Sequence, residues 1–244
     1  MPSYSLLNAD LCDECEGVPF VAASDKLHEV MYFYYRMLDT YHQPYEFRYN
    51  VNAFIQALRN VTWLLQSEES KPSGFDYWYE RAQERMRSNE NLRKFVDLRN
   101  LIVKQGMLVG RSRANVGLFR ARKLKLAFEM EVDLFEDSKE LLRNLVPVLT
   151  GPRGFLDEGH MAIGEQIGVE RLWVLEELGP KDVTDYCRKA YDSIECIVRQ
   201  AVGMAGGWLG NHGLPSSADV RVLLETDIDP SLAEKWGWST SGAE

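Results

Sequence analysis

The sequence predicts a mainly α protein, in which an antiparallel helical bundle is followed by a small β element and further helices. Apolar residues recur at helical spacing in four segments before residue 106 and again after Pro180, and a segment between them alternates apolar and charged residues. With 244 residues, 45% of them hydrophobic, the chain can bury a sizeable core as one large domain or two small ones. We expect an irregular arm at 1–23, the bundle at 24–112 and a strand-plus-helix region at 113–244, which either stands apart or packs with the bundle.

Apolar stripes define the bundle. Four helices are expected, at about 24–43, 50–66, 75–87 and 91–103. Ser24 is placed to cap the first helix, Pro44 to end it, and Gly106 to close the last. The short links between these segments favour antiparallel neighbours.

The β element is predicted from a period of two. Along residues 123–134 the apolar positions are Leu124, Leu126, Phe128, Met130, Val132 and Leu134. This alternation is typical of a long strand with one buried face, and a single strand needs a partner. The partner comes from either 107–119 or 220–224. Further helices are expected at about 138–145, 169–178 and 183–201.

No motif in the chain predicts a cofactor. The glycines between 203 and 213 do not match a phosphate-binding loop or a dinucleotide fingerprint, and there is no nucleophile elbow or zincin motif. A hydrolase or transferase built on the C-terminal half therefore ranks last among the functional hypotheses.

Cysteine and acidic clusters give no metal site. Cys12 and Cys15 form a lone C-x-x-C, whereas structural zinc takes four ligands, and Cys187 and Cys196 stand nine residues apart. The acidic pair Asp157-Glu158, with His160 and Glu165, fits no metal-binding spacing. We expect reduced cysteines and no bound metal.

The N-terminal segment and the apolar runs indicate the compartment. The first residues lack the basic start and apolar stretch of a signal peptide, and no run approaches the roughly 18 apolar residues of a membrane helix. A cytoplasmic protein without a membrane partner is expected.

Charge is unevenly spread along the chain. Residues 80–125 hold 13 Lys/Arg and 4 Asp/Glu, a local charge of +9 in a chain of net charge −9. Residues 129–244 hold 10 basic and 22 acidic residues, a local −12. The basic segment 80–125 is suited to RNA, to the acidic part of the same fold or to a second subunit, and the acidic C-terminal region to a protein partner.

The segment around Arg99 is the candidate site. Arg99 falls on the same helical stripe as Leu92, Phe95, Val96, Ile102 and Val103. A guanidinium on an apolar stripe is costly unless it has a partner. Arg99 therefore faces a cleft, pairs with an acid such as Glu84 or Asp76 inside the bundle, or lies at a subunit interface. Aromatic residues such as Trp63, Trp78 and the run Tyr32–Tyr35 suit base stacking, although helical spacing favours the core.

Several of these residues together resemble the HEPN superfamily of small helical bundles. The resemblance is carried by Tyr49–Asn60, Phe75–Tyr79 and Leu98-Arg99-Asn100, and covers about residues 24–110. Arg99 and Asn100 match the start of the superfamily's RNase signature, and Lys104 occupies the position of its histidine.

The resemblance implies RNA binding or processing, in a stress or antiphage defence module. In active members the arginine holds the phosphate and the histidine handles the proton of the ribose 2′-hydroxyl. A lysine, with an ordinary pKa of about 10.4, is mostly a fixed cation, so Lys104 suits phosphate binding better than proton transfer. An enzyme of this kind would be a metal-independent endoribonuclease with Arg99, Asn100 and Lys104 as its catalytic residues. The alternative is a non-catalytic helical interaction protein, and a homodimer is expected in either case.

Overall fold

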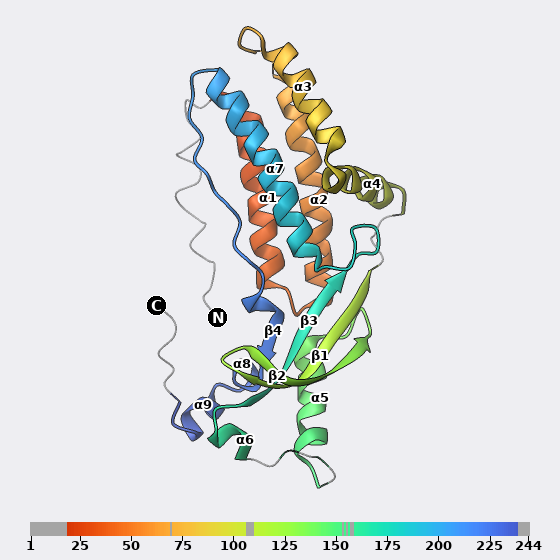
Figure 1. The fold of residues 1–244 in the computed structure, drawn as a ribbon, viewed down its shortest axis with the longest axis vertical. Helices are drawn as coiled ribbons and strands as arrows, with labels where there is room; N and C mark the ends of the chain where they lie inside the picture. The colour runs from red at the N-terminus through yellow and green to blue at the C-terminus, as the bar shows by residue number, and fades with distance from the viewer. Residues whose placement is uncertain are drawn as a thin grey trace.

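A helical bundle and a sheet accompanied by short helices occupy opposite ends of the molecule in the computed structural model (Figure 1). The structure describes residues 19–68, 70–105, 110–152, 154, 156 and 159–238. The expected mainly helical architecture with a β element is confirmed, and the sheet has four antiparallel strands. The helices are α1 (Val21–Asp39), α2 (Pro44–Ser67), α3 (Phe75–Ser88), α4 (Glu90–Gln105), α5 (Ser138–Thr150), α6 (Gly159–Ala162), α7 (Val183–Met204), α8 (Glu225–Ile228) and α9 (Ser231–Lys235). The strands are β1 (Arg111–Arg120), β2 (Lys123–Val132), β3 (Gln166–Val174) and β4 (Val222–Leu224).

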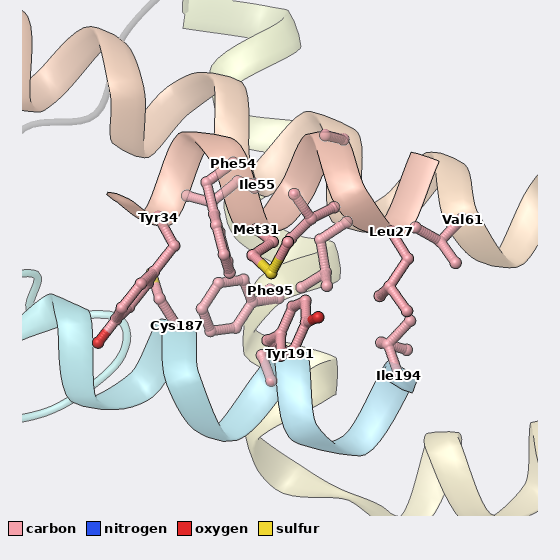
Figure 2. Packing of buried hydrophobic residues seen from close by; sticks show 14 of the residues in the cluster. Leu27, Met31, Tyr34, Phe54, Ile55, Val61, Phe95, Cys187, Tyr191 and Ile194 are labelled. Carbon is pink, nitrogen blue, oxygen red and sulfur yellow. The ribbon is translucent and has the colours of Figure 1, made fainter. Parts of the chain in front are cut away.

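The bundle combines α1, α2, α3 and α4 with α7 from the far end of the sequence. Figure 2 shows Met31 of α1, Phe54 of α2, Phe95 of α4 and Tyr191 of α7 packed in one core. The C-terminal region therefore supplies a helix that completes the bundle, the arrangement that the sequence left open. Helix α4 lies across the long helices rather than alongside them (Figure 1).

Two helix boundaries differ from the sequence prediction. Helix α1 begins at Val21, so Ser24 lies inside it, fully buried, and does not act as its cap. Phe20 takes the cap position with a φ of 63° and stacks on Phe75. Pro44 occupies the first turn of α2 instead of following α1, because a proline needs no hydrogen-bonded N–H there. The bounds of α3, α4 and α7 agree closely with the prediction.

The sheet has the order β2-β1-β3-β4, and all neighbouring strands are antiparallel. The predicted strand is β2, and its partner is β1, from the first of the two candidate segments. The second candidate supplies β4, which pairs with β3. The helix expected at 169–178 is wrong, because the segment forms β3. There Ile167, Val169 and Arg171 lie on one face of the strand and the residues between them on the other. The β-branched residues Ile167 and Val169 also favour a strand.

The β1–β2 hairpin closes through two residues in the left-handed region, Ala121 (φ 44°) and Arg122 (φ 57°). Glycine or asparagine normally fills such a turn. The Arg122 guanidinium offsets this strain by donating to the Val222 carbonyl and to Asp227, both at 2.6 Å. Gly117 is required farther along the hairpin, because a Cβ there would lie 1.9 Å from the Leu126 carbonyl oxygen.

The apolar face of β2 is not buried as the sequence predicted. Leu126, Phe128 and Met130 are 51%, 57% and 37% exposed, and only Val132 is buried. They share a sheet face with Ala114 and Val116 of β1, which belong to a second buried cluster formed by the sheet and α5. Helix α5 covers that face mainly over β3 and β4. The pairing register also shifts between Leu118 and Phe119, which removes Leu124 from the stripe.

Asp182 joins the bundle to the sheet. Its buried carboxylate accepts hydrogen bonds from the Tyr41 hydroxyl (2.5 Å), from the Trp173 backbone N–H (2.9 Å) and from the N–H and hydroxyl of Thr184. These donors lie beyond the end of α1, on β3 and in the first turn of α7. One carboxylate therefore fixes three elements that are distant in sequence.

Arg171 forms the second part of this joint. Its side chain is completely buried and stacks over Trp173, with the guanidinium carbon 4.0 Å from the ring centroid. Burial lowers the pKa of Arg171 to about 10. Its Nε donates to Ser112 Oγ, and its terminal nitrogens donate to Ser138 Oγ and to the carbonyls of Asp133, Leu134 and Glu136. The guanidinium thus fastens the link between β2 and α5 to the sheet.

No helix in the described part of the chain is long and apolar enough to cross a membrane.

Replacing Arg171 with methionine should lower the free energy of unfolding by roughly 3–5 kcal/mol, because two hydroxyls and three carbonyls lose their donor inside the protein. Arg171→Lys should also destabilise, since an ammonium cannot reproduce the planar array of donors. Urea denaturation measures both changes. A loss below about 1 kcal/mol in Arg171→Met would contradict the role of this side chain as the joint.

Stability should fall below neutral pH through His42, whose buried ring has a pKa lowered to about 3 chiefly by burial. The unfolded chain binds this proton with a pKa near 6.5, so between pH 6.5 and 3 it holds more protons than the folded chain. Unfolding therefore becomes easier as the pH drops, by up to about 1.4 kcal/mol per unit. His42→Gln keeps a donor for the Val220 carbonyl and removes the titration. Urea denaturation at a series of pH values should give the variant a shallower slope, and identical slopes would exclude this explanation.

Candidate functional site

A cavity of about 370 Å³ opens between α2, α3 and α4. Its floor consists of apolar side chains from α2, α3, α4 and α7: Ile55, Leu58, Met86, Leu92, Phe95 and Ile194. Three of them, Ile55, Phe95 and Ile194, are seen in the bundle core of Figure 2. Its rim carries the exposed side chains Arg59, Arg87, Arg93 and Asp97. An apolar floor beneath a charged rim suits a ligand that is flat and apolar in one part and charged in another.

The rim is positively charged. Three guanidinium groups face one carboxylate, and no carboxylate of the described residues lies within 4.0 Å of Arg59, Arg87 or Arg93. Arg59 is held by a 2.6 Å hydrogen bond from its Nη1 to Thr62 Oγ1. The cavity mouth is therefore suited to an anion.

A hydrogen-bonded group of neutral side chains supports one wall of the cavity. Tyr79 donates its hydroxyl proton to the Thr62 carbonyl at 3.0 Å and accepts from Gln66 Nε2 at 3.1 Å. Burial raises the pKa of Tyr79. The phenol consequently stays protonated at neutral pH and serves as a fixed hydrogen-bonding group.

Helical spacing aligns the cavity residues. Arg59, Thr62 and Gln66 stand three and four residues apart on α2, so they share one face. Trp63 lies on the same face, between Arg59 and Gln66, and is 61% exposed. The aromatic side chains considered for base stacking thus divide: Trp63 is on the surface, whereas Trp78 packs partly against the core.

The sequence-predicted site residues lie farther along α4. Arg99 is half-buried, and Asn100 and Lys104 are exposed; none of the three lines the cavity. Asn100 and Lys104 follow Arg93 by seven and eleven residues, so they continue the cavity side of α4. Arg99 and Lys104, five residues apart on a helix, point about 140° away from each other.

The pairing of Arg99 with an acid inside the bundle, which the sequence left open, is not seen with either acid that was named. Among the described residues no hydrogen bond or ion pair joins Arg99 to Glu84 or Asp76, and Asp76 pairs with Lys71. The buried face of α4 is narrower than the apolar stripe that the sequence predicted around Arg99. Leu92, Phe95, Leu98 and Ile102 are buried, whereas Val96 and Val103 are 42% and 59% exposed. The assignment of Arg99, Asn100 and Lys104 as catalytic residues stays a prediction.

The basic segment 80–125 divides into two parts. In the hairpin, four arginines pair with acidic residues: Arg111 with Glu176, Arg113 with Glu129, Arg120 with Glu165, and Arg122 with Asp227. On α3 and α4, Lys94 pairs with Glu90, while Arg87 and Arg93 point to the cavity. Apart from Lys123 and Lys125 on β2, the cations of this segment that have no ion pair within the described residues therefore lie around α3 and α4.

The other predicted clusters contain no site in the described residues. No group of three or more metal-ligating side chains occurs there. His160 contacts Glu225, and Glu165 pairs with Arg120. Cys12, Cys15, Asp157 and Glu158 lie outside the described residues.

Sequence reasoning missed the cavity itself. Arg93 and Asp97 on α4 could have been found from their spacing, because they stand four residues apart on one face of a predicted helix. Arg59 belongs to a different helix, and only the crossing of α4 over α2 brings it to the same opening.

These features define a class of protein: a helical bundle completed by a C-terminal helix, with a basic-rimmed cavity and an attached antiparallel sheet. The family model of bacteriophage lambda protein ea47 matches residues 12–213, and the chain belongs to this family. Protein ea47 of Escherichia phage lambda is 37% identical over 82 residues, which are 33% of this chain and 20% of that protein. The chain thus matches about a fifth of the length of this relative. No solved structure matches the chain.

The HEPN assignment is wrong. A family match over residues 12–213 replaces a resemblance carried by three short segments, and the fold includes a helix and a sheet from beyond those segments. The catalytic roles that the resemblance implied for Arg99 and Lys104 lose that support.

Proposed function

We propose that the protein binds single-stranded RNA without needing to cleave it, with one base over the apolar floor of the cavity and phosphates on its arginines. The observation that carries the proposal is the combination of three exposed guanidiniums with an apolar floor. A nucleotide has the same division into a flat, largely apolar base and an anionic phosphate. The net charge of −9 requires that binding be confined to a local basic surface.

A polymer is favoured over a free nucleotide because the polar surface extends beyond the cavity. Lys104 lies on the face of α4 that carries Arg93, about 16 Å farther along the helix axis. Trp63 adds an exposed ring beside Arg59, on which a second base can stack. Phosphates along one strand would therefore meet Arg59, Arg87, Arg93 and Lys104 in turn.

Replacing Arg59, Arg87 and Arg93 together with glutamine should weaken binding of a labelled single-stranded oligoribonucleotide about tenfold or more at low salt, since contacts to charged groups are lost. The slope of log K against log salt concentration should become shallower by roughly 0.7 for each lost phosphate contact. Fluorescence anisotropy across a salt series measures both quantities.

The matched control removes three exposed cations elsewhere, Arg143, Lys181 and Lys189, by the same substitution. Equal affinities of the two triple variants would show that the loss of RNA affinity follows from net charge alone, which would contradict the proposal. Absence of RNA binding by the native protein at low salt would contradict it as well. Stacking is tested by Trp63→Ala against Trp208→Ala, which removes a ring that is 78% exposed. Only the first should weaken binding.

Cleavage is tested separately, because the catalytic assignment concerns other residues. If Arg99, Asn100 and Lys104 form a metal-independent ribonuclease site, the native protein cuts total RNA in EDTA and Arg99→Ala does not. We expect intact RNA with both proteins, since Arg99 and Lys104 diverge on α4. Gel electrophoresis of the treated RNA decides the outcome, and EDTA-resistant cleavage that depends on Arg99 would restore the enzymatic hypothesis.

A further inference from the structure

The tyrosine in the cavity wall orients two amide side chains. The Tyr79 hydroxyl gives its proton to the Thr62 carbonyl, so its oxygen can only accept, and Gln66 donates to it from Nε2 at 3.1 Å. Burial raises the pKa of Tyr79, and side-chain hydrogen bonds from Gln66 and Gln83 act against that effect. A hydrogen bond lowers the pKa of a phenol by donating to its oxygen, so Gln83 also turns its NH2 group toward this hydroxyl. Gln83 stands four residues after Tyr79 on α3, on the same face of the helix.

The two amides keep their carbonyl oxygens for a ligand. Gln66 and Gln83 both line the cavity, and among the described residues no hydrogen bond uses the Oε1 atom of either. An amide oxygen that a ligand covers without giving it a donor loses its hydrogen bonds to water, which costs free energy. A ligand that fills the cavity therefore has to bring hydrogen-bond donors to this wall.

The hydroxyl groups of the wall have no proton to offer. Thr62 Oγ1 donates to the Arg59 carbonyl at 3.0 Å, and the proton of Tyr79 is used on the Thr62 carbonyl. Asp97 of α4 lines the same cavity and is a further acceptor. Charged donors come only from the rim arginines among the described lining residues, and the proposed function assigns these to phosphates. The neutral wall thus presents mainly acceptors.

We propose that the cavity selects an RNA base with an exocyclic amino group, adenine or cytosine, over uracil, and that Gln66 and Gln83 accept its two amino hydrogens. This inference rests on the proposed function, because it names the base that the RNA-binding cavity takes. An amino group brings two hydrogens to two amide oxygens, whereas the edge of uracil has one N–H between two carbonyls. Uracil would leave one amide oxygen without a donor and place a carbonyl oxygen against it. Tyr79 is a positioning residue, since it acts on the base only through the two amides.

Oligocytidine and oligouridine test the selection directly, because their bases have rings of the same size and differ where an amino group is replaced by a carbonyl. In fluorescence anisotropy with labelled hexamers at neutral pH and low salt, the native protein should bind oligocytidine about tenfold more tightly. Gln66→Leu/Gln83→Leu should reduce this ratio to about twofold or less by weakening the binding of oligocytidine. Tyr79→Phe keeps the ring but releases the amides, so it should reduce the ratio in the same way. The dependence on salt should stay unchanged in both variants, because the phosphate contacts remain.

The matched control is Gln56→Leu/Gln200→Leu, which removes two exposed amides that do not line the cavity and should keep the native ratio. Equal binding of the two strands by the native protein would overturn the inference and leave RNA binding itself standing. A preference for oligouridine would overturn it too, because the rim arginines would then read the base. A preference for oligocytidine that survives in the double glutamine variant would place base selection elsewhere, with the same consequence.

The comparison of the two strands on the native protein needs no variant, so a substitution that prevents folding cannot hide a failure. A preference that survives only in Tyr79→Phe would overturn the positioning role of the tyrosine. Absence of binding to either strand at low salt would instead remove the proposed function, and this inference with it.

Discussion

The hydrogen bonds of one buried carboxylate and one buried guanidinium hold the two ends of this molecule together. Asp182 receives donors from the end of α1, from β3 and from α7, and Arg171 secures the link between β2 and α5. Both groups are charged and lie out of water, so each is stable only while its partners stay in place. The position of α7 in the bundle, and hence the shape of the bundle core, depends on this joint because Asp182 also caps α7.

The same chain uses its basic residues in two ways. Arginines of the β1–β2 hairpin are neutralised by acids from the C-terminal half, which makes them part of the fold. Arginines around the cavity have no such neighbour in the described residues. The difference follows from geometry: the sheet places β1 beside β3, whose flanking residues Glu165 and Glu176 reach the hairpin arginines, whereas α3 and α4 face the apolar side of α2. The local charge of +9 is therefore not a single surface.

The apolar face of β2 is largely exposed, with Leu126, Phe128 and Met130 at 51%, 57% and 37%. Helix α5 contacts the sheet mainly at β3 and β4, and the register shift between Leu118 and Phe119 turns Leu124 out of this face. Family membership places this arrangement in the ea47 group, whose phage lambda member is much longer than the segment matched here.

The sequence by itself determined the elements whose patterns are local. Periods of 3.6 and 2 located α3, α4, α7 and β2, because side chains on one face of a helix or strand must share an environment. It failed at 169–178, where a short apolar segment was assigned to a helix although Val169 and Trp173 are of types that favour strands, and where β1 supplies the hydrogen-bonding partner. Only the tertiary structure decided that α7 completes the bundle, that Arg59 and Arg93 line the same cavity, and that the apolar side chains of β2 are largely exposed. These features depend on the packing of residues far apart in the chain.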